Sequence, residues 1–203
     1  MNARQPAGTK PTVPLLLDGD EVLPTSVDIA RHADHVGGGS LLFPPAEREA
    51  IVRFTEVSDQ LLDIGRCALL GGLRNNREAQ REGLPALVPA ALRGVLAPLT
   101  VTGAMFIAFK HDVPRDPAAM ASRMRPLLDE VRAARGDRTY LLSGFTFADV
   151  AVASALQAVR PYADGRLGPG TRAVWSNEAI AADYENLLAW RDALYEKHRH
   201  PNG

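Results

Sequence analysis

Residues 145–159, FTFADVAVASALQAV, predict a helix at the centre of the protein. Thr146 and Asp149 have the spacing of a capping box, in which each side chain accepts a hydrogen bond from the other residue's backbone N–H. Phe145 before the cap and Val150 after it form the matching hydrophobic staple. The rest of the stretch is apolar nearly all round, so we expect other helices to surround it. The pattern also suits an ordinary buried helix of any all-α protein.

Composition is that of an ordinary soluble globular chain: 203 residues, 46% hydrophobic, 23% charged and a net charge of −1. Such a balance favours neither nucleic acid nor a membrane as a partner. The weakly charged run over 83–108 is interrupted by prolines, which argues against a membrane span. The chain has no apolar signal segment at its start, and its single Cys67 excludes an internal disulfide. We therefore expect a cytoplasmic protein.

The first part of the chain predicts a small β-hairpin followed by a helix. Two apolar runs within 13–23 flank an Asp-Gly turn, and Pro14 lies at the start of the first run, where a strand tolerates it. Ser26 is a candidate N-cap for a short helix over 27–34, whose inward residues are Ile29 and Ala33. A lone hairpin is marginal in water. We expect this one to be held by that helix and the helical domain, or by a second chain.

From Ala46 onward the chain is predicted to be helical, because apolar residues recur at spacings of three and four. The interior prolines of the second region predict a broken helix pair, and Pro126 predicts a kink. Tyr184, Leu187, Trp190 and Leu194 are expected to face inward. The expected helical regions are 47–73, 77–110, 117–135, 145–159 and 178–197, with a loop over 165–170.

Four segments in this order resemble the cytosolic glutathione S-transferases. They are TVPLLLDGDEVL (12–23), like the third and fourth strands; LPTSVDIARHAD (23–34), like the next helix; LSGFTFADVAVA (142–153), like the capped core helix; and YENLLAW (184–190), like the last helix. The resemblance implies a mainly α protein, with an all-helical bundle after a partial thioredoxin-like hairpin and helix. The implied divisions are a partial N-terminal domain over 1–36, a linker over 37–45 and a helical C-terminal domain over 46–203, in a homodimer.

The resemblance also implies a glutathione-binding half-site. In the family a Val-Pro bond is cis and the valine backbone pairs with the cysteinyl part of glutathione, which points to Val13 and Pro14. A serine at the helix N-terminus holds the γ-glutamyl carboxylate, which points to Ser26. Thr25 stands where the family commonly has an acidic or amide side chain, so we expect weaker binding. Plain helix capping by Ser26 and a strand-edge role for Pro14 are the alternatives.

The family's thiolate-activating Tyr, Ser or Cys has no counterpart before Val13. A strand–helix–strand unit takes about 30 residues, whereas twelve precede Val13 and none of them is Tyr, Ser or Cys. The sequence thus predicts a truncated thioredoxin-like domain and no catalytic residue. Two hypotheses follow: conjugation of glutathione to a small hydrophobic electrophile if the missing unit is supplied, or a non-catalytic module for dimerisation or partner binding.

Other candidate residues favour structural roles. Cys67 on the long helix is predicted to be a core residue. His32 and His35 have a spacing that could seat a metal, but no carboxylate or Cys cluster accompanies them, so we expect no metal and no cofactor besides glutathione as co-substrate. Asp59 is a faint candidate for contact with a neighbouring glutathione. The remaining expectations are a solvated tail for His198 and His200 and core positions for Trp175, Tyr184 and Trp190.

Overall fold

The computed structural model describes residues 14–39, 41–85, 87–110, 117–164 and 166–199. The predicted fold class is confirmed, because helices dominate the chain and follow one small antiparallel hairpin. The elements are β1 (Leu16–Asp18), β2 (Glu21–Leu23), α1 (Ser26–Val36), η1 (Pro45–Glu47), α2 (Arg48–Leu73), α3 (Arg77–Glu82), α4 (Ala90–Lys110), α5 (Pro117–Arg135), α6 (Phe147–Ala155), η2 (Leu156–Ala158), α7 (Pro169–Trp175), α8 (Glu178–Asp183) and α9 (Glu185–His198).

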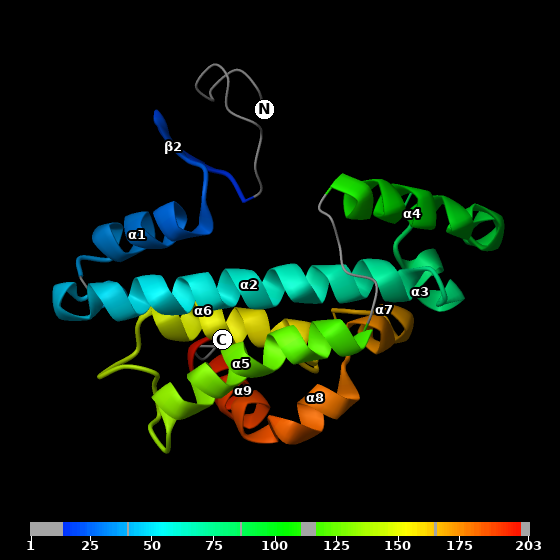
Figure 1. Ribbon diagram of the computed structural model, residues 1–203. Coiled ribbons are helices and arrows are strands. Elements are labelled where there is room, and N and C mark those ends of the chain that lie inside the picture. The colour runs from blue at the N-terminus through cyan, green and yellow to red at the C-terminus, as the bar shows by residue number, and fades with distance from the viewer. Residues whose placement is uncertain (1–13, 40, 86, 111–116, 165, 200–203) are drawn as a thin grey trace.

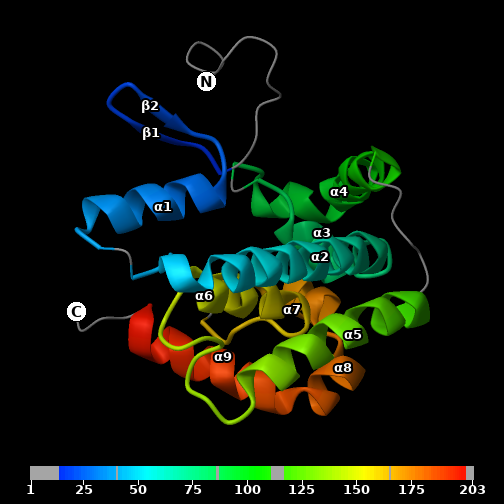
Figure 2. The same cartoon turned by 60° about the vertical axis from the view of Figure 1, so that its left-hand side comes forward.

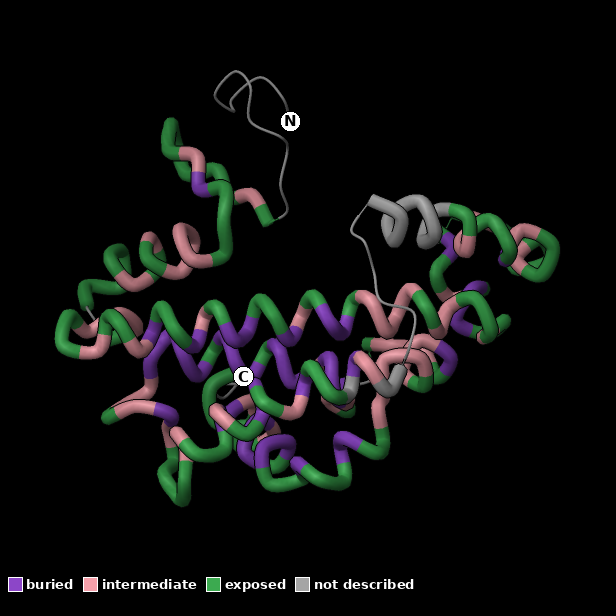
Figure 3. Tube along the Cα trace, viewed as in Figure 1, coloured by how far each residue is buried: buried purple, intermediate pink, exposed green. Residues whose placement is uncertain are grey.

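Helix α2 is the long central element, and the other helices are arranged around it (Figures 1 and 2). In both views α1 and the hairpin lie on one side of α2, and α5, α6, α8 and α9 lie on the other. Burial follows the same division, with α1 a mixture of intermediate and exposed residues, the hairpin mostly exposed, and the side of α2 that faces α6 buried (Figure 3). The predicted core face of α2 is confirmed by its buried residues Ile51, Phe54, Val57, Leu61 and Ile64.

The hairpin turns one residue beyond the predicted Asp-Gly pair, because Asp18 still belongs to β1. Leu16 pairs with Leu23 and Asp18 with Glu21, so the loop between the strands is Gly19-Asp20. Gly19 adopts a φ of +57°, a conformation that glycine reaches without a Cβ penalty. All of β1 is exposed, whereas Leu23 at the end of β2 is buried. The hairpin is therefore anchored through β2, and pairing of β1 with a second chain stays a prediction.

The central helix α6 begins with a capping box formed by Thr146 and Asp149. Asp149 Oδ2 accepts hydrogen bonds from the Thr146 backbone N–H at 2.9 Å and from the Thr146 hydroxyl at 3.2 Å. Its other oxygen accepts from the Leu141 N–H at 2.8 Å. Asp149 is fully buried, and burial raises its pKa above the ordinary value although these hydrogen bonds act to lower it. One carboxylate thus fixes both the start of α6 and the loop before it.

Three predictions for α6 and the chain that follows it are wrong. The apolar stretch is not buried on all sides, since Val150 is 40% exposed and Ser154 is exposed as well. The helix also ends at Ala155 and tightens into η2, where Leu156 and Ala158 are buried. The expected loop over 165–170 gives way to α7, which begins at Pro169, a residue suited to the first turn of a helix.

The expected last helix is two helices, α8 and α9. They meet at Tyr184, whose φ of −125° and ψ of 29° are not helical. The Tyr184 hydroxyl donates to Asp129 Oδ1 on α5 at 2.8 Å. This hydrogen bond holds the junction of α8 and α9 against α5. The inward positions of Tyr184, Leu187, Trp190 and Leu194 are confirmed because all of them are buried. Periodicity could not locate the break, since the buried residues keep helical spacing across it.

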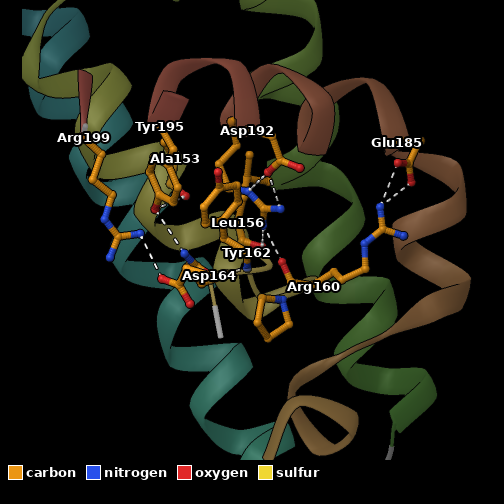
Figure 4. A network of polar contacts seen from close by, with 12 residues as sticks. Ala153, Leu156, Arg160, Tyr162, Asp164, Glu185, Asp192, Tyr195 and Arg199 are labelled. Atoms are coloured by element: carbon orange, nitrogen blue, oxygen red, sulfur yellow. Dashed lines mark hydrogen bonds and ion pairs between the residues drawn. The ribbon is translucent and has the colours of Figure 1, made fainter. Parts of the chain in front are cut away.

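Arg191 ties α9 to the end of η2 through the carbonyls of Leu156 and Arg160, two residues that Figure 4 labels. Its guanidinium is almost entirely buried and donates to the backbone carbonyls of Leu156, at 3.3 Å, and Arg160. Asp192 Oδ1 accepts from Arg191 Nε at 2.7 Å. Arg160 in turn pairs with Glu185 at the start of α9, at 2.6 Å. The Leu156 carbonyl also accepts from the backbone N–H groups of Val159 and Arg160, so the guanidinium matters most as a donor to the Arg160 carbonyl beyond η2.

Glu82 joins α3 to α7 in a similar way. Its carboxylate accepts from the backbone N–H groups of Gly170, at 3.0 Å, and Thr171, at 2.7 Å, in the first turn of α7. Burial alone would raise the pKa of Glu82, but the hydrogen bonds from Thr171 and Gly170 outweigh it and hold the pKa below its ordinary value. A Cβ on Gly170 would lie 2.4 Å from the Ala79 backbone N. Glycine is thus what lets α7 approach α3.

Two glycines of α2 predict opposite effects of the same substitution. A Cβ on Gly65 would lie 2.2 Å from the Ala158 Cβ, whereas a Cβ on Gly71 would meet nothing within 4 Å. We expect Gly65→Ala to lower the free energy of unfolding by about 2 kcal/mol through overpacking. Gly71→Ala should raise it by about 0.5–1 kcal/mol, because alanine favours the helix. Urea titration of both variants tests this contrast, and equal effects would contradict the close approach of η2 to α2.

Candidate functional site

The N-terminus of α1 is the predicted glutathione half-site, and its side chains already bind one another. The N-cap is Thr25, not Ser26 as the sequence suggested. The Thr25 hydroxyl accepts from the Asp28 backbone N–H at 3.1 Å and donates to Asp28 Oδ2 at 2.6 Å. Ser26 is exposed at the first helical position. An acidic side chain of the chain itself therefore lies where the helix dipole favours an anion.

The hairpin brings the predicted half-site residues to one end. Pro14 and Thr25 each lie two residues beyond the Leu16–Leu23 pair, so both are at the open end of the hairpin. Both are exposed. Val13 falls outside the described residues. The geometry thus places Pro14, Thr25 and Ser26 in one neighbourhood, while their binding of glutathione stays a prediction.

Helix α1 is held to the hairpin by His32. Its Nε2 lies 2.8 Å from Asp18 Oδ2 and its Nδ1 lies 3.1 Å from Glu21 Oε2. Both ring nitrogens of His32 are therefore engaged by carboxylates on either side of the turn. His35 is exposed, and no cluster of His, Cys, Asp and Glu suited to a metal occurs within the described ranges. Ala33, expected to face inward, is exposed as well.

Cys67 and Trp190 take structural places, whereas Asp59 is exposed and Trp175, predicted to be a core residue, is only half-buried. Cys67 is half-buried beside the core, and burial raises the pKa of its thiol above the ordinary value, the opposite of an activated nucleophile. Burial also raises the pKa of Asp59, with a further contribution from the charge of Asp63. Trp190 is a core residue whose Nε1 donates to the Thr139 carbonyl at 2.8 Å.

A cavity of about 380 Å³ lies between α6 and α9. Phe145, proposed as a staple residue, stacks on His198 with ring centroids 4.0 Å apart, and both residues line the cavity together with Val150. His198 was expected in a solvated tail; its exposed ring instead has one face covered by Phe145. Burial, with the charge of Lys197, lowers the pKa of His198 below its ordinary value. The stack had no signal in the sequence, because 53 residues separate its partners.

The helical part of the chain also matches a known family. A comparison with protein families matched residues 78–193 to the glutathione S-transferase, C-terminal domain, which is more than half of the 203 residues. The chain belongs to the glutathione S-transferase C-terminal domain family. No curated protein and no solved structure matched in the two other comparisons.

This glutathione S-transferase domain match covers α3 to most of α9 and includes the capping box at Thr146 and Asp149 as well as Arg191. The hairpin, α1 and all of α2 lie before the matched range. The glutathione half-site is thus outside the matched residues, and the division of the chain into domains stays a prediction. None of the described helices is long and apolar enough to span a bilayer.

Proposed function

We propose that the protein is glutathione S-transferase-like, and that its fold serves conjugation of glutathione to a small hydrophobic electrophile when a unit bearing a thiolate-activating residue is supplied. The observation that carries the proposal is the family match over residues 78–193. The γ-glutamyl carboxylate would bind at the N-terminus of α1, next to Thr25 and the hydroxyl of Ser26, with Val13 and Pro14 on the neighbouring strand. A cytoplasmic location and a homodimer are parts of the same proposal.

A second candidate is a non-catalytic, transferase-like module, which the position of Asp28 favours. Its carboxylate already accepts from the Thr25 hydroxyl at 2.6 Å and lies in the first turn of α1. A bound carboxylate there would meet a like charge, which costs about 0.3–1 kcal/mol at an exposed helix end. Glutathione binding at this end would then be weak, and the helical domain would serve dimerisation or partner binding.

Calorimetric titration with glutathione tests whether the charge of Asp28 weakens glutathione binding at the N-terminus of α1. We expect Asp28→Asn to strengthen glutathione binding about two- to fivefold, which is the cost of the opposing charge expressed as a ratio of affinities. Ser26→Ala should weaken binding, because it removes the hydroxyl donor. Asp20→Asn, in the hairpin turn, is the matched control, since it makes the same change of charge away from the helix end.

The two candidates separate in a conjugation assay with an aryl halide. Measurable turnover by the 203-residue chain would exclude the non-catalytic module. Glutathione binding that responds to Asp28→Asn without any turnover would support a binding module. Affinity that is the same in the Ser26→Ala, Asp28→Asn and Asp20→Asn proteins would show that α1 is not where glutathione binds.

A further inference from the structure

A small pocket of about 290 Å³ lies between α1 and the start of α2. In both views α1 lies beside the first half of α2 (Figures 1 and 2). Arg31 belongs to α1 and Arg48 is the first residue of α2. The other residues that line the pocket are Phe43, Pro45 and Ile51. The linker between the two helices thus brings two arginines to one pocket.

Arg31 is held over an aromatic ring. Its guanidinium carbon lies 4.3 Å from the centroid of the Phe43 ring, and the Phe43 ring stacks on Phe147 with ring centroids 5.1 Å apart. Phe147 is the buried first residue of α6. Attraction to a ring face does not consume the five N–H donors of a guanidinium, so they stay available to an anion. The core therefore holds Arg31 at the pocket without using its donors.

The two arginines of the pocket are not neutralised by the part of the chain that the structure describes. Arg53, one helical turn further along α2, pairs with Glu130 at 2.6 Å. By contrast, within 14–39, 41–85, 87–110, 117–164 and 166–199 no carboxylate forms an ion pair with Arg31 or Arg48. Both side chains are exposed. A dissolved anion can therefore reach them without displacing a carboxylate of the protein.

The carboxylates that are close to these arginines in the sequence serve elsewhere. Asp34 Oδ1 accepts from the Leu42 backbone N–H at 3.1 Å, and Glu47 Oε1 accepts from the Ser143 N–H at 2.8 Å. Glu49 is exposed and, like the other two, is not among the described lining residues. The N-terminal end of the 26-residue helix α2 adds the positive end of its dipole. The pocket therefore favours an anion.

Two guanidinium groups at one pocket suit an anion that carries more than one charge. A phosphate monoester has about −1.5 to −2 charges at pH 7 and three acceptor oxygens, which is enough for both arginines. A carboxylate has one charge and two oxygens. Arginine also pairs with phosphate through two parallel N–H···O bonds. The pocket is at the lower end of the usual size range of about 300–1,000 Å³, so the ester must be small.

We propose that this pocket binds the phosphate group of a small phosphate monoester between Arg31 and Arg48. The site is separate from the glutathione half-site. Arg31 follows Ser26 by five residues in α1, which places it about 7.5 Å farther along the helix axis and about 140° around it. Binding at the pocket needs no thiol chemistry, so it is independent of whether the chain conjugates glutathione.

NMR titration at constant ionic strength tests the pocket, with glycerol phosphate as the ligand and glycerol as its uncharged counterpart. We expect saturable binding of glycerol phosphate at one site, at about millimolar concentration, and none of glycerol. The side-chain Nε–H signals of Arg31 and Arg48 should shift. Arg31→Gln and Arg48→Gln should each weaken binding about two- to fivefold, and the double variant about tenfold or more.

Arg74→Gln is the matched control for these variants. Arg74 is exposed and follows the last residue of α2, so its replacement makes the same change of charge at the far end of the same helix. The affinity for glycerol phosphate should stay at the wild-type value. Ser26→Ala, at the glutathione half-site, should leave it unchanged as well, and a loss of binding in that protein would overturn the separation of the two sites.

Inorganic phosphate and acetate test the assigned ligand class. Inorganic phosphate should compete for the same site with lower affinity, because it lacks the carbon chain that can contact Pro45 and Ile51. Acetate should bind more weakly than either phosphate, since it brings one charge and two oxygens. Acetate that binds as tightly as glycerol phosphate would overturn the choice of a phosphate. Inorganic phosphate that binds at least as tightly would overturn the choice of an ester.

The double variant decides whether the arginines form the site at all. Circular dichroism establishes that it is folded. Equal affinity for glycerol phosphate in wild type, the folded double variant and Arg74→Gln would overturn the proposal. A changed sedimentation coefficient with unchanged phosphate affinity would also overturn it, and would assign Arg31 and Arg48 to contact with a second copy of the chain. None of these measurements uses glutathione, so failure here leaves the proposed function standing.

Discussion

Asp149→Ala is expected to lower the free energy of unfolding by about 3 kcal/mol and the melting temperature by ~6–12 °C. The substitution removes a fully buried carboxylate that accepts from the backbone N–H groups of Leu141 and Thr146. Those donors would remain in the protein interior without a partner, which costs more than the loss of an ordinary hydrogen bond. Urea titration at pH 7 with tryptophan fluorescence measures the change.

The effect of Asp149→Ala should also depend on pH. Because burial raises the folded-state pKa of Asp149, protonation of this carboxyl favours the folded state. The added stability is fully present below the ordinary carboxyl pKa of about 3.9 and is lost as pH rises through the folded pKa. The difference between wild type and Asp149→Ala should therefore widen as pH falls through that window. Asp137→Ala, at an exposed position, is the control and should change stability by less than about 0.5 kcal/mol. A loss of the same small size in both variants would refute the role assigned to Asp149.

Arg191→Met is expected to lower the free energy of unfolding by about 2 kcal/mol. Methionine fills much of the same volume but leaves the Arg160 carbonyl without its donor, whereas the Leu156 carbonyl keeps the backbone N–H groups of Val159 and Arg160. The Arg160 carbonyl left without a donor costs about 1–3 kcal/mol, and the buried apolar side chain offsets part of that loss. Arg191→Lys should fall between, because one ammonium replaces several guanidinium donors.

Arg166→Met is the matched control for Arg191→Met. Arg166 is 65% exposed and pairs with Asp164 at 3.4 Å, so its removal should cost no more than about 1 kcal/mol. Chemical unfolding measures all three variants. If Arg191→Met proved as stable as wild type, the buried guanidinium would contribute nothing to stability.

Local chemistry in the sequence was enough to locate most elements. The Thr146 and Asp149 pair locates the start of α6, the Asp-Gly turn locates the hairpin, and the recurrence of apolar residues along α2 gives both its length and its buried face. These features depend on contacts within a few residues or on a repeating period, both of which a sequence displays directly. For the same reason a few short segments were enough to indicate the helical family.

Only the tertiary structure showed which residues from segments far apart in the chain contact one another. It replaced Ser26 by Thr25 as the cap of α1, divided the last helix at Tyr184, and put His198 against Phe145. It also gave Arg191 its buried carbonyl partners and brought Arg31 and Arg48 to one pocket. Each of these depends on which helix surfaces meet and on the conformation at their ends. Hydrophobic periodicity carries no information on those contacts, because it records how buried a residue is and not what it is buried against.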